Sequence, residues 1–258
     1  MSALTRIHAL AANTFREAIR NKLLYTLLGF SFVMIGSGVI LATLSYVEVD
    51  EILQDMGMGA IRFFSAGIAI FVGIGLVHNE VDRRTIFTIL SKPVSRAEFL
   101  VGKWAGLTFT VWLQLALMTV AFAGVSMLAG APLVGDHFVA FALIGLELMV
   151  LVAIATLFSA FTTPMLAAFF TVGLWMIGHL TRDLQALGIQ SGEEGVSSLT
   201  TFLFLVMPDF EVFNKTLEAV HGLPIPGNEI GLATLYAIGY TVSTLILAVM
   251  IFSRRDFK

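Results

Sequence analysis

The sequence contains no cysteine and few charged residues. Charged side chains make up 13% of its 258 residues, whereas hydrophobic side chains make up 57%. A soluble domain carries roughly 25% charged residues, so the composition predicts an integral membrane protein, organised as one membrane domain over residues 1–258. The lack of cysteine excludes disulfides, thiolate-bound metal ions and iron–sulfur clusters.

Sequence motifs that bind nucleotides or metal ions are also missing. No Gly-x-x-x-x-Gly-Lys-[Ser/Thr] phosphate loop occurs in the chain, and Gly102-Lys103 is only a dipeptide at a predicted membrane boundary. The 5 histidines lie at or beyond the predicted boundaries, so no two of them face each other as haem ligands inside the bilayer. The 11 methionines are scattered, which favours packing over a soft-metal site. We therefore expect no catalytic, cofactor-binding or metal-binding residue.

Six apolar segments are long enough to cross a bilayer, because a spanning helix needs about 20 mainly apolar residues. The second and fifth are near the lower limit of length. A polar, basic stretch precedes the first segment, which is therefore expected to be an uncleaved anchor. The sequence predicts an all-α polytopic membrane protein with helices near residues 23–46, 60–77, 104–131, 138–160, 164–180 and 230–252.

Lysine and arginine are concentrated on one side of these segments. They precede the first span, lie between the second and third, and follow the sixth, whereas only Arg62, Arg182 and Lys215 are expected on the other, acidic side. By the positive-inside rule, both termini and the loop at 78–103 are cytoplasmic.

Residues 3–22 form a predicted amphipathic helix. Its apolar residues recur at helical spacing, while its basic residues gather on another face; the apolar ones are Leu4, Ile7, Ala11, Phe15 and Ile19. Such a helix would lie in the cytoplasmic interface. The alternative is a solvated basic leader that only enforces the topology.

The cytoplasmic loop at 78–103 carries recognisable local chemistry. Ser95 and Glu98 fit a capping box at a helix start, and Pro93 fixes the turn before it. Residues 85–90 form a short, partly apolar stretch between charged flanks, which is typical of a docking surface. The alternative is a helix pair packed against the membrane face of the protein itself.

The segment 181–229, on the far side, is too long for a simple connection. It contains an apolar run at 196–207 that Pro208 ends and that is too short to span. We expect a re-entrant or interfacial helix here, followed by an amphipathic piece in which Phe210, Phe213 and Leu217 share a face. The alternative is a small external cap with purely structural packing.

Glu147 is the only acidic residue deep in a predicted span. A charge there costs a few kcal/mol, so Glu147 should face protein or water, or stay protonated. One role is contact with cargo or coupling to protons, and the other is a neutral side chain bonded to a Ser, Thr or backbone carbonyl of a neighbouring helix. Gln114 is a weaker candidate for the same pathway and is expected mainly to form an interhelical hydrogen bond.

Small residues in the spans predict close helix contacts. Ala69 and Gly73 are four residues apart in the second span, and further glycines occur at Gly29, Gly36 and Gly173. These patterns are common in membrane helices and do not identify a dimer interface.

The order of these features resembles the type-2 permease subunit of ATP-binding-cassette (ABC) exporters. The similar stretches are NTFREAIRNK at 13–22, the loop from Glu80 through Pro93-Val94-Ser95-Arg96 to Gly102-Lys103, Met207-Pro208-Asp209-Phe210, and IFSRRDF at 251–257. The chain is most similar to the bacterial branch that includes the permease of the nitrous-oxide-reductase maturation transporter.

The resemblance implies a set of partners. A separate ABC ATPase, which would hold ATP and Mg, would dock on a coupling helix within residues 80–98, and a second permease copy would meet the first and fifth spans. A bacterial inner membrane would surround the bundle, an accessory periplasmic protein is a further candidate partner, and nucleic acid is not expected. The implied docking residues are Glu80, Asp82, Arg83, Arg84, Thr85, Ile86, Phe87, Leu90, Pro93, Arg96 and Glu98.

Three functions therefore compete. The first is a permease that moves a substrate with ATP hydrolysed by its partner. The second is an ion-driven secondary transporter, although such proteins usually show inverted repeats and several ionisable groups in the membrane. The third is a non-transporting scaffold, which a neighbouring gene with a phosphate loop would disfavour.

Overall fold

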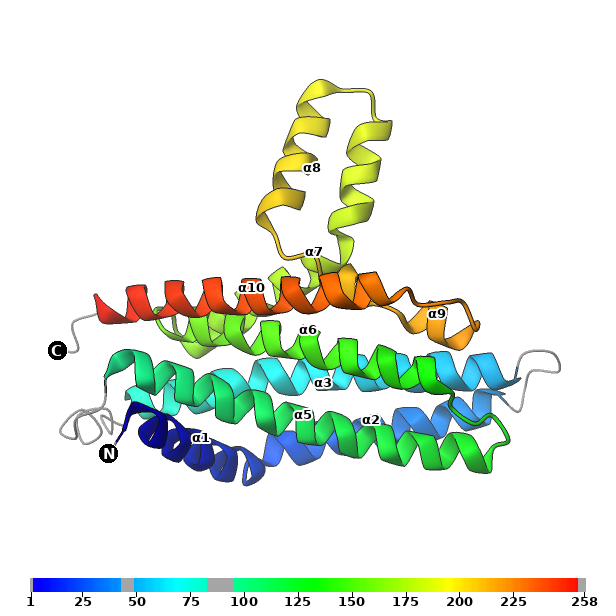
Figure 1. The fold of residues 1–258 in the computed structure, drawn as a ribbon, viewed down its shortest axis with the longest axis horizontal. Helices are drawn as coiled ribbons and strands as arrows, with labels where there is room; N and C mark the ends of the chain where they lie inside the picture. Colours follow the sequence, from blue (N-terminus) through cyan, green and yellow to red (C-terminus); the bar gives the residue numbers. More distant parts are fainter. Residues whose placement is uncertain (1, 43–48, 83–94, 255–258) are drawn as a thin grey trace.

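The chain folds into a bundle of long helices (Figure 1). The computed structural model describes residues 2–42, 49–82 and 95–254, and for residues 76–82 it describes the helix without the side chains. Six helices in this part are long and apolar enough to cross a membrane, which confirms the predicted all-α, polytopic fold. They are α2 (Lys22–Ala42), α3 (Val49–Asp82), α5 (Arg96–Leu128), α6 (Gly135–Ser159), α7 (Pro164–Gln190) and α10 (Gly227–Ser253).

The second span begins earlier than the sequence predicts. Helix α3 starts at Val49 rather than near residue 60, so Asp50 and Glu51 form its first turn instead of a loop. Carboxylates in a first turn stabilise a helix because they face the positive end of its dipole. The sequence prediction followed hydropathy alone and therefore missed this polar extension.

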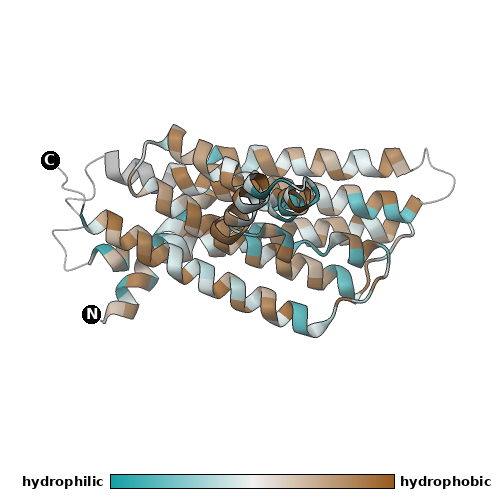
Figure 2. Ribbon diagram, turned by 90° about the horizontal axis from the view of Figure 1, so that it is seen from above, coloured by the Kyte–Doolittle hydropathy of each residue, from teal (hydrophilic) through white to brown (hydrophobic). Residues whose placement is uncertain are grey.

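Helix α6 is the central helix of the bundle. It packs against α3, α5, α7 and α10, and every residue from 147 to 156 is buried. A helix that is apolar on all sides needs neighbours on all sides. By contrast, only 22% of the apolar stretch of α2, and likewise of α7, is buried within the described chain. Figure 2 shows hydrophobic residues (brown) along the length of the helices.

The amphipathic N-terminal helix is confirmed as α1 (Ala3–Ile19), and it packs on the first turns of α5. Gly102 and Gly106 of α5 form the surface on which α1 packs, called the α1 seat below. A Cβ atom at Gly102 would lie 2.7 Å from Cβ of Leu10, and one at Gly106 would lie 2.5 Å from the carbonyl oxygen of Ala11. Of the predicted apolar face, Ala11 and Phe15 contact α5, whereas Leu4 is 79% exposed.

Salt bridges hold this contact at both ends. The guanidinium of Arg6 donates to both carboxylate oxygens of Glu98, and Nζ of the buried Lys103 lies 3.4 Å from Oε2 of Glu17. Phe15 meets Phe109 edge to face, with ring centroids 5.0 Å apart. These contacts fix α1 on α5 in both rotation and register.

The predicted capping box at the start of α5 is confirmed. Ser95 Oγ accepts from the backbone N–H of Glu98, and Oε2 of Glu98 accepts from the backbone N–H of Ser95. The neighbouring Arg96 donates from Nη1 to the carbonyl oxygens of Phe252 and Ser253 at the end of α10. The first turn of α5 therefore contacts both α1 and α10.

A helical hairpin stands out from the side of the bundle (Figure 1). It consists of the C-terminal half of α7, which turns away from the bundle, and α8 (Glu194–Val206). Gly188 permits their close crossing, because a Cβ there would lie 1.9 Å from Oγ1 of Thr200. The short helix predicted in the 196–207 run is thus present, whereas its placement in or on the membrane stays a prediction.

Two short helices, η1 (Phe210–Phe213) and α9 (Thr216–Val220), return the chain from the hairpin to α10. Phe210 and Phe213 are buried, but Leu217 is 60% exposed. The predicted shared face is therefore wrong for Leu217. The prediction failed because the chain breaks at residues 214–215, between the two helices, and this break ends the helical periodicity on which the prediction rested.

A larger side chain at Gly106 should displace α1. In Gly106→Leu the new Cβ meets the backbone of Ala11, which cannot rotate away, so the free energy of unfolding should fall by about 1–3 kcal/mol. Thermal unfolding in detergent measures this loss. Gly124→Leu is the matched control, because Gly124 lies on the same helix with no contact within 4 Å of its Cβ position. An equal loss of unfolding free energy in the two variants would contradict the packing of α1 on Gly106.

Candidate functional site

A buried carboxylate lies in the middle of the central helix. Glu147 is 0% exposed and stands 12 residues from either end of α6. This is about 18 Å from each end at the rise of an α-helix. The group is therefore far from bulk water on both sides of the bundle.

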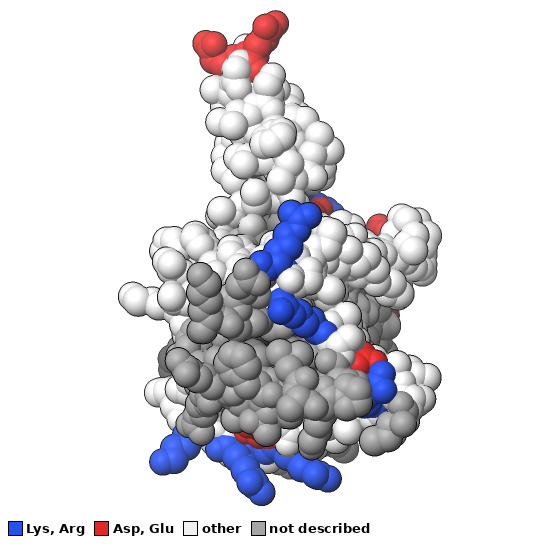
Figure 3. Space-filling model, turned by 90° about the vertical axis from the view of Figure 1, so that its left-hand side faces the viewer, with Lys and Arg blue, Asp and Glu red and all other residues white. Residues whose placement is uncertain are grey.

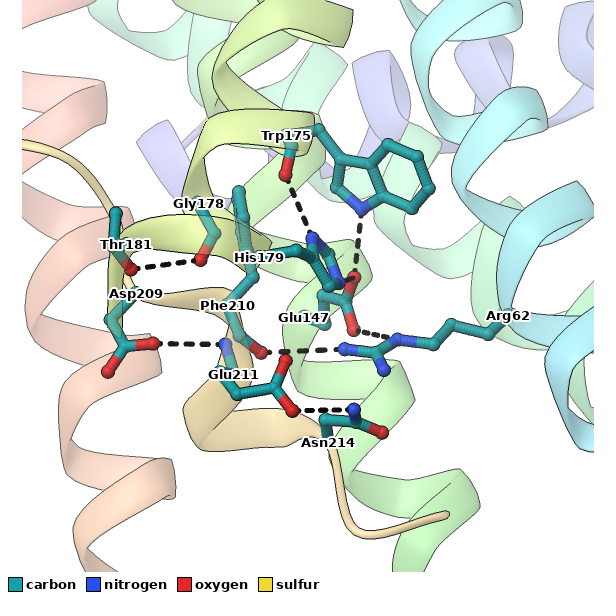
Figure 4. A network of polar contacts seen from close by, with 10 residues as sticks. All are labelled: Arg62, Glu147, Trp175, Gly178, His179, Thr181, Asp209, Phe210, Glu211 and Asn214. Carbon is teal, nitrogen blue, oxygen red and sulfur yellow. Dashed lines mark hydrogen bonds and ion pairs between the residues drawn. The ribbon is translucent and has the colours of Figure 1, made fainter. Parts of the chain in front are cut away.

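Three side chains from two other helices surround this carboxylate (Figure 4). Nε of Arg62, on α3, donates to Oε2 at 2.9 Å, and Nε1 of Trp175, on α7, donates to Oε1 at 2.9 Å. Nε2 of His179, one turn after Trp175, lies 3.3 Å from Oε1. Both carboxylate oxygens are thus occupied by N–H groups or a cationic partner.

The geometry corrects two sequence-based expectations. Arg62 does not lie beyond the far boundary but inside α3, 12% exposed, where it pairs with Glu147. Glu147 accordingly bonds charged and aromatic N–H groups rather than a Ser, a Thr or a backbone carbonyl. Because each charge would be costly alone in an apolar interior, the pair is more stable than either ion by itself. The signal was present in the sequence: Arg62 and Glu147 are opposite charges within apolar segments.

The segment that follows the hairpin also contacts this cluster. Nη2 of Arg62 lies 3.5 Å from the carbonyl oxygen of Phe210, and the rings of His179 and Phe210 stack with centroids 5.6 Å apart. A Cβ at Gly178 would lie 2.6 Å from the carbonyl oxygen of Pro208, so only glycine allows this approach. Charge pairing and close packing thus place the Met207-Pro208-Asp209-Phe210 motif against α7.

Asp209 fixes the start of η1 within this motif. Its Oδ2 accepts from Nε of Arg182 at 2.8 Å, and its Oδ1 accepts from the backbone N–H of Glu211 at 3.0 Å. Its own N–H donates to the hydroxyl of Tyr236 on α10 at 2.8 Å. The motif therefore joins the hairpin, η1 and α10, a role that the sequence alone did not reveal.

Gln114 does not form the predicted interhelical bond. Its Nε2 lies 3.3 Å from Sδ of Met118, one turn later on the same helix, and its Oε1 has no hydrogen-bond partner among the described residues. Helix geometry explains the difference, because residues four apart face each other along one helix. Gln114 and Glu147 are 33 positions apart, on different helices, and no described contact joins them.

The predicted docking residues divide into two groups. Glu80 and Asp82 lie in the last turns of α3, where side chains are not described, and Arg83, Arg84, Thr85, Ile86, Phe87, Leu90 and Pro93 lie outside the described residues. Arg96 and Glu98 are described, and both make contacts within the chain. These two residues hold the end of the segment onto α10 and α1, while their contact with a partner stays a prediction.

Among the side chains that the structure describes, in residues 2–42, 49–75 and 95–254, no group of three or more His, Asp or Glu could hold a metal ion. The buried cluster around Glu147 is an ion pair with hydrogen bonds rather than a ligand set. What it can do is hold α3, α6, α7 and η1 in a fixed relation in the middle of the bundle.

Comparison with known proteins gives one family. A family model described as ABC-2 family transporter protein matches residues 8–257. Among curated proteins, none matches the chain.

Removal of Arg62 should destabilise the bundle strongly. Arg62→Leu leaves Glu147 buried without its cationic partner, which costs about 3–5 kcal/mol for a pair of this kind. The double variant Arg62→Leu/Glu147→Gln removes both charges and keeps an acceptor for Trp175, so most of the loss should be recovered. Thermal unfolding in detergent of the wild type, both single variants and the double variant measures this coupling. A double variant no more stable than Arg62→Leu would refute the pairing.

Proposed function

The chain belongs to the ABC-2 family of transporter proteins, and we propose that it works as the membrane permease of an ABC transporter whose ATP is hydrolysed by a separate subunit. The observation that carries this proposal is the family match over residues 8–257 in a chain with six apolar helices. A bacterial inner membrane and export as the direction of transport belong to the proposal, as does the branch of the nitrous-oxide-reductase maturation permeases; all rest on the motifs quoted above.

The cytoplasmic end is the end that carries both termini. In Figure 1 the termini lie at the same end as the last turn of α3 and the first turn of α5. Figure 3 looks onto this end and shows Lys and Arg side chains around it, whereas acidic side chains mark the tip of the hairpin. The positive-inside rule supports a cytoplasmic assignment of this end.

The segment between α3 and α5 is the proposed docking site for the ATPase. The end of α3 and the start of α5, which flank it in the chain, lie at this same end, and Ser95 to Glu98 are held by the capping box and by the bonds to α1 and α10. A push on this segment would therefore act on α3, α5, α1 and α10 together. Closure of an ATPase pair would in this way shift the bundle between two arrangements.

A second copy is proposed to pack against α2 and α7. These two helices expose most of their apolar side chains, and their glycines Gly29, Gly36 and Gly173 have no atom of another element within 4 Å of the Cβ position. Open small residues let a partner helix approach closely in a membrane. This arrangement agrees with the expectation that the first and fifth spans meet the partner.

The buried cluster does not favour an ion-driven mechanism. Glu147 is closed off by Arg62, Trp175 and His179, whereas a coupling carboxylate has to exchange its ligand with water on each side in turn. We propose that Glu147 acts on the transport pathway indirectly, by fixing the middle of α7. Gln114, whose side-chain carbonyl oxygen has no hydrogen-bond partner in the part of the chain that is described, is the weaker pathway candidate.

Reversal of charge in the docking segment should release the ATPase. In Arg83→Glu/Arg84→Glu the segment loses two cations beside the stretch at 85–90, and in a deletion of 85–90 it loses its apolar surface. Both variants should keep their thermal stability but lose the ATPase during affinity purification. Arg254→Glu/Arg255→Glu is the matched control, with the same change of charge near the C-terminus. Undiminished co-purification with the deletion variant would refute the docking site.

Single cysteines should cross-link two copies through α2 or α7. Because the natural chain has no cysteine, each introduced thiol gives an unambiguous product. Gly36→Cys and Gly173→Cys should yield a covalent dimer with a short thiol cross-linker in membranes, as resolved on a denaturing gel. Gly124→Cys, on the exposed face of α5, is the control and should stay monomeric. Absence of dimer from both test positions would contradict this interface.

A further inference from the structure

One face of α10 lines two cavities along most of its length. Glu229 and Leu232 line a charged cavity of about 310 Å³ near the end of α10 that is remote from the termini. Tyr236, Gly239, Tyr240, Ser243, Thr244 and Leu247 line an apolar groove of about 490 Å³ further along the helix. These positions recur every three or four residues, so they share one helical face.

The charged cavity presents both signs of charge. The guanidinium of Arg182 lies on one wall, bonded through Nε to Asp209 and half exposed. Nζ of Lys215 lies 2.8 Å from Oε1 of Glu218 and 2.7 Å from Oε2 of Glu229, whose side chain is 45% exposed. Burial opposes the charge on Lys215, but its hydrogen bonds with these two carboxylates prevail and raise its pKa. The cavity therefore offers an exposed cation and an exposed anion.

The groove is lined mainly by apolar side chains of three helices. Ile154, Leu157 and Phe158 of α6 and Leu174 of α7 form its walls opposite α10. Gly239 also lines the groove, and no atom of another element is within 4 Å of a Cβ placed there. Because α6, α7 and α10 are each long and apolar enough to cross a membrane, we expect this apolar groove to face the acyl chains of the bilayer.

The two cavities are adjacent through Asp209. This residue binds Arg182 of the charged cavity with its carboxylate and Tyr236 of the groove with its backbone N–H. From Leu232 to Leu247 the helix rises about 22 Å. One leaflet, headgroups included, is about 20–22 Å thick. The combined length thus equals that of one lipid molecule with its headgroup at the end remote from the termini.

We propose that this face of α10 binds one amine-bearing zwitterionic phospholipid of the surrounding bilayer, with its phosphate at Arg182, its ammonium at Glu229 and an acyl chain over Gly239. Charge selects this headgroup over an anionic one. The charged groups in contact around the cavity are Arg182, Lys215, Asp209, Glu218 and Glu229, which carry a net charge of −1. A headgroup with its own net negative charge is repelled, whereas a phosphate with an attached ammonium satisfies both exposed charges.

Native mass spectrometry of the purified full chain tests the proposal. The delipidated protein in detergent is mixed with equal amounts of dioleoyl phosphatidylethanolamine and dioleoyl phosphatidylglycerol, and the lipid that remains bound in the gas phase is counted. The wild type should retain one phosphatidylethanolamine per chain, with a preference of about tenfold over phosphatidylglycerol, which corresponds to about 1.4 kcal/mol. Equal retention of the two lipids would overturn the assignment of the headgroup.

Two variants separate the tail groove from the headgroup cavity. Gly239→Leu fills the groove and should abolish retention, whereas Gly231→Leu is the matched control, with equally open space on α10 outside both cavities. Glu229→Gln removes one negative charge, so this variant should retain phosphatidylethanolamine and phosphatidylglycerol in nearly equal amounts. Retention in Gly239→Leu at the wild-type level would overturn the proposal, with thermal unfolding showing that each variant is folded. The test needs no ATPase, so its result is independent of the proposed transport function.

Discussion

The ion pair between Arg62 and Glu147 is the constraint around which the rest of the bundle is arranged. A carboxylate in the middle of the most buried helix requires a cation at the same depth, and α3 supplies Arg62. The same guanidinium reaches the carbonyl oxygen of Phe210, and the same carboxylate accepts from Trp175. One electrostatic requirement therefore fixes the contacts of α3, α6, α7 and η1, and the hairpin leaves the bundle next to this fixed point.

Close backbone approach provides the second organising contact, and glycine permits it at several places. Gly102 and Gly106 seat α1, Gly178 admits Pro208, and Gly188 admits Thr200. Packing takes over from hydrophobicity inside a membrane, because lipid tails are as apolar as leucine. Gly29 and Gly36 of α2 and Gly173 of α7 have no such contact among the described residues, which is why they belong to the proposed dimer surface.

The parts of this structure that local chemistry dictates could be predicted from the sequence. Hydropathy located the six spans, and the capping box of Ser95 and Glu98 was legible from four consecutive residues. The pairing of Arg62 with Glu147 could not be derived with certainty, because it joins residues 85 positions apart. The seat at Gly102 and Gly106 was missed for a different reason: the four-residue spacing is visible, but nothing local identifies α1 as its occupant. The early start of α3 escaped because hydropathy does not register a polar helical turn.

The seat of α1 on α5 has a consequence for how the protein is made. Arg6 and Glu98 are 92 positions apart, so α1 leaves the ribosome long before the helix on which it rests. Two spans have to enter the membrane while α1 waits with its apolar face uncovered, and an amphipathic helix in that condition adsorbs to the nearest bilayer surface. The emergence of α5 then offers a better site a short distance away. Adsorption to the membrane would thus cover the apolar face of α1 until α5 has been synthesised. The order of translation would determine when α1 reaches its final position.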